Sequence, residues 1–342
     1  MADKRRQRWI RVVYLLLAVV VVAQALLSVD SADGEESERK LLAMVTFTPT
    51  HSWTADVKRA MEEEITAVCE ENGWECVMRV GRDATEQSRC MLALAERQVD
   101  CMILFPLDGA SLKTAALLVQ KKGIPLVVFD REIPDFAPAA TVKGDNGGIG
   151  RLAASMLNDR FPQGTKVLEL MGDTSTVPSQ RTDGFDEQLA ESMEKEQLGY
   201  TNWQREEARD LFLAWARSHT QQEIDRVEAV YVHDDEIAFG VLDALELCRM
   251  EGPKFENLQV MVGGTSGARE MYERILEETE LEMTFALYSP AMGREAVRVG
   301  ERILKGEEYQ EMTILPTKTV NRKNAGSYLE QLEKGGEGTC TS

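Results

Sequence analysis

Four consecutive side chains that could do chemistry, His233, Asp234, Asp235 and Glu236, stand at the end of the apolar run 227–233. Histidine and carboxylates are ligands for metals and can act as acid/base pairs. The other two histidines are His51 and His219, and no HExxH, GxSxG or phosphate-loop motif occurs. The glycines of GDNGGIG fit a helix start or a crossing between lobes better than a nucleotide loop. We therefore expect no metal, no cofactor and no enzymatic activity.

The adjacent aspartates have a simpler interpretation as the start of a helix. Asp234 or Asp235 can accept hydrogen bonds from the backbone of a helix beginning near Glu236, whose own charge suits the positive first turn. Adjacent residues of an extended chain point to opposite sides, so a dyad that shares a proton is not expected. One aspartate caps the helix, and the other is left free to face a crevice.

Short apolar runs alternate with amphipathic stretches of helical period from residue 41 onward. The apolar runs cover residues 41–48, 75–80, 101–106, 125–130, 166–172, 227–233, 258–264 and 282–288. Helical segments between them include 55–73, which Gly73 ends, 205–223 and 236–250. Strands that are apolar throughout predict parallel sheets covered on both faces. The pattern indicates an α/β, doubly wound fold with one or two sheets, and 143–150 is a natural crossing point between two lobes.

Polar residues follow each predicted strand, where doubly wound sheets bind their ligands. These segments are 49–53, 130–131, 172–181, 233–235 and 263–267. Trp53 and Trp203 each precede a predicted helix on a loop that can reach the same crevice, whereas Trp215 has core spacing. Indole faces together with carboxylates and guanidinium groups suit the C–H faces and hydroxyls of a sugar.

The N-terminus indicates where the protein is located. A basic segment, KRRQRWIR, precedes an apolar run of about 18 residues. This fits either a cleaved signal peptide or a membrane-spanning anchor, and both place the rest of the chain outside the cytoplasmic membrane. The net charge of −19 disfavours nucleic-acid binding. Cys69, Cys76, Cys90 and Cys101 leave a disulfide in the first lobe open, with no predicted connectivity.

Residues 41 to about 320 resemble a type I periplasmic sugar-binding protein of the ribose-binding kind. The resemblance depends on the order and spacing of IPLVVFDREI, VKGDNGGIGRLAA, QRTDGF, NWQREEA, HDDEIAFGVLDAL and GERILKGEE. It implies two α/β lobes joined by a three-segment hinge. The implied parts are an anchor or signal with linker (1–40), an N-terminal lobe (41–144 plus 288–316), a C-terminal lobe (145–287 plus 317–330) and a flexible tail (331–342).

The same resemblance assigns ligand-binding roles to residues of both lobes. It implies that the sugar contacts His51, Trp53, Thr54, Asp130, Arg131, Arg181, Trp203, Asp234 and Thr265. Trp203 would stack opposite Trp53, and Asp234 would stand where the family usually has Asn, leaving Asp235 as the helix cap. Thr265 replaces a hydroxyl-binding aspartate of the family, so the ligand can be a sugar other than ribose, or a polyol.

The implied function is capture of a sugar or sugar-like molecule by lobe closure and its presentation to an ABC permease. The alternative is a membrane-anchored sensing partner of a two-component or chemotaxis receptor. A monomer is expected in both cases. Sugar-responsive repressors share this core, but an apolar segment takes the place of their DNA-binding helices.

Overall fold

The computed structural model describes residues 39–333, which form two six-stranded sheets. The predicted signal or anchor lies outside the described residues, as does the tail from residue 334 onward. Among the helices that are described, none is both long and apolar enough to cross a membrane.

The first sheet consists entirely of parallel neighbours. Its spatial order is β11 (Met312–Leu315), β5 (Ala140–Gly144), β4 (Leu126–Phe129), β3 (Cys101–Leu104), β1 (Leu41–Phe47) and β2 (Glu75–Gly81). The strands β3 and β4 are buried along their whole length, as expected for strands covered on both faces.

The second sheet is parallel except for its last strand. Its order is β12 (Thr319–Asn321), β10 (Glu282–Leu287), β9 (Val260–Thr265), β8 (Val227–Val232), β6 (Lys166–Met171) and β7 (Glu194–Tyr200). Only β12 runs antiparallel to its neighbour, β10. The predicted α/β fold with doubly wound parallel sheets is confirmed, and two sheets are present rather than one.

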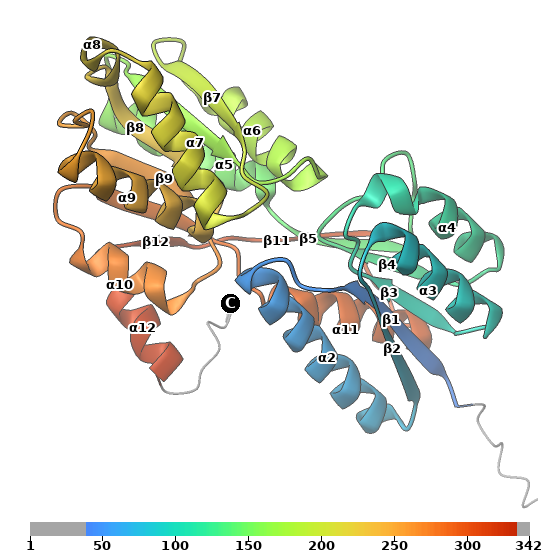
Figure 1. Cartoon of the computed structure of the whole chain (residues 1–342). Helices are drawn as coiled ribbons and strands as arrows, with labels where there is room; N and C mark the ends of the chain where they lie inside the picture. Colours follow the sequence, from blue (N-terminus) through green and yellow to red (C-terminus); the bar gives the residue numbers. More distant parts are fainter. Residues whose placement is uncertain (1–38, 334–342) are drawn as a thin grey trace, which may run out of the picture. The chain divides into compact units, whose positions relative to one another are not determined.

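Helices cover both faces of the first sheet (Figure 1). On one face, α2 (Ser52–Asn72) packs against α11 (Met292–Lys305) and the strands. On the other face lie α3 (Ala84–Glu96) and α4 (Gly109–Lys121). Gly73 ends helix α2, as the sequence predicted, and it has a left-handed backbone conformation with φ 67°.

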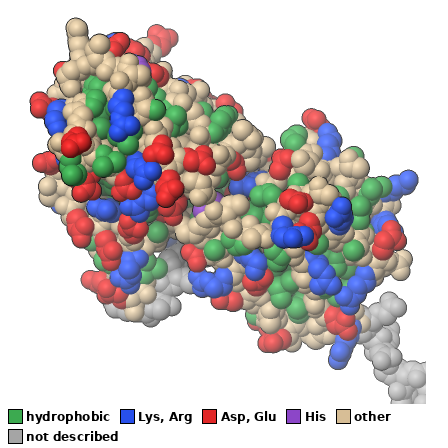
Figure 2. Space-filling model, in the orientation of Figure 1, with side chains coloured by type: hydrophobic (Ala, Val, Ile, Leu, Met, Phe, Trp, Pro, Cys, Tyr) green, Lys and Arg blue, Asp and Glu red, His purple; other side chains and the backbone are tan. Residues whose placement is uncertain are grey.

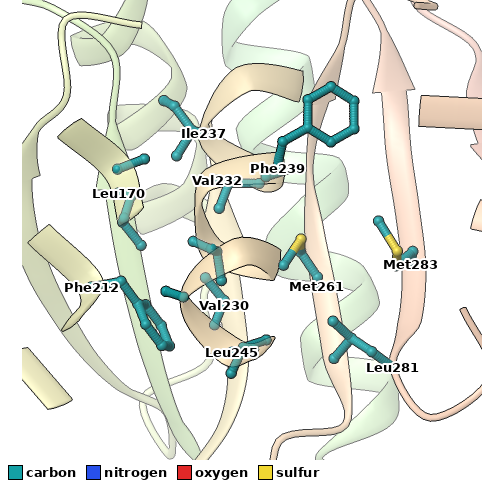
Figure 3. Packing of buried hydrophobic residues seen from close by; sticks show 14 of the residues in the cluster. Leu170, Phe212, Val230, Val232, Ile237, Phe239, Leu245, Met261, Leu281 and Met283 are labelled. Carbon is teal, nitrogen blue, oxygen red and sulfur yellow. The ribbon is translucent and has the colours of Figure 1, made fainter. Parts of the chain in front are cut away.

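The second sheet is covered in the same way. On one face lie α7 (Arg205–Ser218), α9 (Asp235–Met250), α10 (Arg269–Glu277) and α12 (Ala325–Glu333), and on the other lie α5 (Asn146–Arg160) and α6 (Thr176–Gln188). The short α8 (Gln221–Ile224) leads into β8. Figure 3 shows Phe212 and Ile237 meeting Val230 and Val232 of β8 in this core. Each such buried side chain stabilises the fold by about 1.5–3 kcal/mol.

Three connections carry the chain between the two sheets. The chain leaves the first sheet after β5, returns after β10 to form α11, and leaves again between β11 and β12. The carboxyl ends of β1, β4, β8 and β9, from both sheets, meet at one shared crevice. The described cysteines Cys69, Cys76, Cys90, Cys101 and Cys248 are all free thiols, so the pairing that the sequence left open among the first four is absent.

Close packing of α5 on α6 depends on glycine. A Cβ atom added to Gly184 would lie 2.1 Å from the carbonyl oxygen of Gly147 on α5. We expect Gly184→Ala to destabilise the fold by about 2 kcal/mol, because backbone atoms cannot move aside as a side chain can. Urea unfolding of the wild type and the variant measures the difference in unfolding free energy. The control is Gly326→Ala in α12, where an added Cβ meets nothing within 4 Å, and an unfolding free energy equally changed in both variants would contradict the argument.

Candidate functional site

A cavity between the two sheets collects residues from the carboxyl ends of several strands. The empty space between its lining atoms, open solvent included, is about 480 Å³. Its lining consists of His51, Ser52, Trp53, Asp130, Arg131, Val177, Arg181, Trp203, Asp234, Asp235, Glu236, Thr265, Ser266 and Tyr288. These residues end or follow β1, β4, β6, β7, β8, β9 and β10, which is where parallel α/β sheets bind ligands.

The structure brings eight of the nine predicted residues to this cavity, and Thr54 is the exception. The Thr54 hydroxyl donates to the carbonyl of His51 (2.8 Å) and accepts from the backbone N–H of Thr50 (3.1 Å). Its position in the first turn of α2 turns the side chain back toward the preceding loop. Thr54 therefore orients the loop that carries His51 and Trp53.

Three aromatic rings of the cavity lie next to one another, with His51 beside both Trp53 of the first lobe and Trp203 of the second. The His51 ring lies 6.3 Å from the Trp53 ring and 6.1 Å from the Trp203 ring, with interplanar angles of 14° and 29°. Burial, followed by the positive charge of Arg131, lowers the pKa of His51 to about 4, so this ring is uncharged at neutral pH. The Trp53 Nε1–H donates to the carbonyl of Tyr288 (2.9 Å), which fixes the indole against the hinge.

Trp203 is held in place by its backbone and by a glycine. Its φ of 60° is unusual for a residue other than glycine. A Cβ atom on Gly172 would lie 2.1 Å from the Trp203 indole, so only glycine leaves room for the ring. The Nε1–H of Trp203 is buried and has no hydrogen-bond partner among residues 39–333. The Trp203 side chain nevertheless interacts with the Asp173 carboxylate. Burial alone would raise the pKa of that group, but Arg131, Ser175 and Trp203 lower it.

Arg181 is a buried cation on the C-terminal side of the cavity, 3% exposed. Its Nε donates to Oδ1 of Asn146 (3.0 Å), and an Nη donates to the carbonyl of His233. The guanidinium lies 4.8 Å from the ring centre of Tyr288 and 5.6 Å from that of Trp203. No carboxylate of the described residues forms an ion pair with it, so its charge is directed at the cavity.

Asp130 and Arg131 approach from the N-terminal side. Asp130 has a φ of 66°, and its carboxylate accepts a hydrogen bond from the Tyr288 hydroxyl. Burial raises the pKa of Asp130, while Arg131 opposes the shift. Arg131 donates to the carbonyl of Leu107 and forms an ion pair with Asp173 of the other lobe (3.1 Å).

The roles expected for the two adjacent aspartates are exchanged. Asp234, not Asp235, is the cap of α9, since its Oδ1 accepts from the backbone N–H of Ile237 (3.0 Å). The Asp235 carboxylate instead accepts from the N–H (2.9 Å) and the hydroxyl of Ser266. Helical backbone angles begin one residue earlier than expected, at Asp235, and this moves the cap to Asp234. Both aspartates still border the cavity.

His233 turns away from the cavity and into the second lobe. Its ring is fully buried and lies 3.1 Å from a carboxylate oxygen of Glu169. Burial lowers the pKa of His233, and the hydrogen bond to Glu169 opposes that shift. No group of three His, Cys, Asp or Glu side chains within residues 39–333 is placed to hold a metal ion.

Apart from Trp203, which was predicted from its own loop, two lining residues, Glu236 and Tyr288, lie outside the strand-end segments that the sequence predicted to face the crevice. Tyr288 directly follows β10, so the strand-end rule applied to the run 282–288 could have found it. The other lining residues not named as ligand contacts lie within the predicted segments, and they are Ser52, Val177, Asp235 and Ser266.

Residues 42–308 match the family described as the periplasmic binding protein domain. The chain is 24% identical to the ribose import binding protein of Bacillus subtilis over 242 residues, 70% of this chain and 75% of that protein. A solute-binding protein of an ABC transporter from Bacillus halodurans with bound myo-inositol has a TM-score of 0.74 at 20% identity, covering 87% of this chain and 99% of that one. The fructose-binding periplasmic domain of a hybrid two-component system has a TM-score of 0.73 at 23% identity, with 86% and 95% covered.

Proposed function

The chain belongs to the periplasmic binding protein family, and on this basis we propose that it captures a sugar or polyol between its lobes outside the cytoplasmic membrane. The observation that carries the proposal is the cavity itself. It combines the indole rings of Trp53 and Trp203 with the hydrogen-bonding groups of Asp130 and Arg181, and it receives residues from both lobes. Aromatic faces bind the C–H faces of a sugar ring, while paired donors and acceptors bind its hydroxyls.

Binding without chemical conversion is the activity that this lining supports. The pKa of His51 is lowered to about 4, so its ring is only a weak base, and the His233 ring points into the lobe, where it contacts Glu169. The ligand would be enclosed when the lobes close and released when they open. Acidic and basic side chains are interspersed over the face that Figure 2 shows, which is typical of a solvated surface.

The test is a ligand screen on the full-length chain purified in mild detergent. Pentoses, hexoses and polyols are added at millimolar concentration, and the melting temperature and tryptophan fluorescence are recorded. Stoichiometric, reversible binding of at least one compound is expected, with fluorescence changing because Trp53 and Trp203 line the cavity. A complete panel without any shift would refute the proposal.

Delivery to an ABC permease is the first candidate for the next step, and sensing is the second. The myo-inositol-binding relative belongs to an ABC transporter, whereas the fructose-binding relative is part of a two-component system. Ligand-stimulated ATP hydrolysis by a permease from the same genome, reconstituted in vesicles with this protein, supports transport. Copurification with a membrane sensor kinase in a ligand-dependent manner supports sensing.

The ion pair between Arg131 and Asp173 holds the lobes together. A second contact between the lobes is the hydrogen bond from the Ser52 hydroxyl to Glu236 (3.1 Å). We expect Asp173→Asn to weaken ligand affinity about tenfold, mainly through faster dissociation, because the closed form loses a largely buried charge pair. Calorimetry measures the ligand affinity, and stopped-flow fluorescence measures the dissociation rate.

The matched control for that variant is Asp243→Asn. It removes a similar pair, Asp243 with Arg205 (2.7 Å), that lies entirely within the second lobe. Its ligand affinity should stay within about twofold of the wild type. If both variants lose affinity equally, the loss is a general effect of removing an ion pair and the role in closure is wrong.

A further inference from the structure

The cavity carries more negative than positive formal charge. Four carboxylates line it, those of Asp130, Asp234, Asp235 and Glu236, against the two guanidinium groups of Arg131 and Arg181. Arg131 is already paired with Asp173. None of the four carboxylates forms an ion pair with a Lys, Arg or His side chain in residues 39–333. With a neutral sugar bound, a proton on Asp234 offsets one of these negative charges, and the other three carboxylates still outnumber the guanidinium groups.

The carboxylates at the end of β8 can also accept more hydrogen bonds than the protein donates to them. A carboxylate accepts at about four positions. Asp234 uses one oxygen for the N–H of Ile237. Asp235 is 3% exposed and uses Oδ2 for Ser266, while its Oδ1 is buried without a hydrogen-bond partner among the described residues. A buried carboxylate oxygen without a partner is costly unless a ligand satisfies it.

Acidic side chains at a helix N-terminus are common, because they complement the helix dipole. That explanation accounts for the Asp234 oxygen that accepts from the N–H of Ile237, but not for the other oxygen of this carboxylate. It does not account for the buried Oδ1 of Asp235, nor for three successive acids lining one wall of a ligand cavity. A compensating group with several donors and a positive charge would fit both observations.

We propose, on the basis of the sugar-binding function proposed above, that the ligand is an amine-bearing sugar or polyol whose ammonium group binds the carboxylates of Asp234 and Asp235. An ammonium is a compact charge with three donors and no acceptor, and carboxylates are acceptors only. Arg181 then binds the ligand's hydroxyls. A site built for a charged donor discriminates strongly against an analogue without it.

Matched probes test this by calorimetry on the full-length chain. D-Glucosamine is compared with D-glucose and N-acetyl-D-glucosamine, and an amino-deoxy-scyllo-inositol is compared with scyllo-inositol and myo-inositol. At least one amine should bind at least about tenfold tighter than its neutral counterparts. Asp234→Asn should remove most of this preference, so that amine and neutral probes bind this variant with affinities within about threefold of each other.

The control for Asp234→Asn is Asp83→Asn. Asp83 caps α3 with the same kind of hydrogen bond, to the N–H of Glu86 (2.8 Å), and does not line the cavity. Asparagine is as good a cap as aspartate, so both variants should fold. Equal affinities of the Asp83→Asn variant and the wild type for the amine are expected. Equal losses in both variants would overturn the assignment.

Proton release gives a second measurement. Burial, reinforced by Asp235 and Glu236 and opposed by the N–H of Ile237 and by Arg181, raises the pKa of Asp234 to about 8. At pH 7 this carboxyl is mostly protonated, and an ammonium drives it to ionise. Amine binding at pH 7 should therefore release close to one proton, detected as a dependence of the binding heat on the buffer's ionisation enthalpy. The Asp234→Asn variant and neutral probes should release none.

The outcomes separate the two proposals. Neutral sugars or polyols that bind as tightly as their amines, or tighter, overturn the amine assignment and leave sugar binding standing. Amine binding without proton release or without dependence on Asp234 overturns the role of that carboxylate. No binding by any probe at millimolar concentration overturns both the assignment and the proposed function.

Discussion

Replacing Arg181 with methionine is expected to weaken ligand binding at least about a hundredfold. Methionine fills similar space and can still pack on Trp203 and Tyr288, so the change removes chiefly the charge and the donors. A hydrogen bond from a charged group to a buried partner contributes about 1.5–3 kcal/mol. Two such bonds from one guanidinium to ligand hydroxyls account for the expected loss.

The position of Arg181 explains why no neighbouring side chain can replace its hydrogen bonds to the ligand. Its guanidinium is fixed by Asn146 Oδ1 and by the carbonyl of His233, and it has no carboxylate partner among the described residues. Arg181→Lys keeps the charge but loses the planar fork, so an intermediate loss of about tenfold is expected. Calorimetry with the best ligand from the screen measures both variants.

Loss of folding would also abolish binding, so the Arg181→Met variant requires a folding measurement. The variant leaves the Asn146 and His233 acceptors without a donor and should lose about 1–3 kcal/mol of unfolding free energy. Thermal melting in the absence of ligand shows whether it remains folded at the temperature of the titration. A folded variant that binds within threefold of the wild type would refute the assignment of Arg181 to the ligand.

The fold could be predicted from the sequence wherever strands are apolar throughout. β3 and β4 are such strands, and β8 is interrupted only by Glu228, so none of the three shows the spacing of an amphipathic helix. The strand β7, EKEQLGY, was missed because it is an edge strand with polar side chains along most of its length. The strands β11 and β12 have four and three residues, too few for a period to show.

The candidate site was predictable because the carboxyl ends of parallel strands meet. That rule, with the family resemblance, brought His51, Arg131 and Arg181 to one cavity although they are far apart in sequence. The rule failed where the backbone geometry of the first helical turn determines the direction of a side chain. Thr54 lies in the first turn of α2 and binds its own loop, and the start of α9 made Asp234 rather than Asp235 the cap. Such differences depend on backbone angles that residue types alone leave open.

Replacing Glu169 with glutamine is expected to lower the unfolding free energy by about 3 kcal/mol at pH 7. Glu169 lies on β6, fully buried, and accepts from the Thr182 hydroxyl (2.6 Å) and from the side-chain amide of Gln197 (2.9 Å). Lys195 forms an ion pair with it (3.1 Å). A glutamine would direct one NH2 group at these donors and remove the charge that compensates Lys195.

The dependence of this loss on pH follows from the pKa of the carboxyl. Burial alone would raise the pKa of Glu169, but the hydrogen bonds from His233 and Thr182 and the charge of Lys195 lower it to about 2, against 4.5 for an ordinary glutamate. The unfolded state therefore binds the proton more readily. Glu169 stabilises the fold above pH 4.5 and loses this effect as the pH falls through about 2. The difference between wild type and variant should narrow in the same interval.

Urea unfolding of both proteins between pH 7 and pH 3.5 measures this difference, which should be constant above about pH 4.5 and begin to narrow below it. The control is Glu196→Gln, which removes the partner of Lys166 (2.6 Å) from a carboxylate that is 34% exposed, so the expected loss is less than about 1 kcal/mol. Glu169 is also linked to the cavity through His233. The His233 ring contacts Glu169, and the His233 carbonyl accepts a hydrogen bond from Arg181. Ligand affinity of the folded Glu169→Gln variant should fall by less than about tenfold. A loss of affinity as large as that of Arg181→Met would mean that this network sets the position of the guanidinium, not only the stability of the lobe.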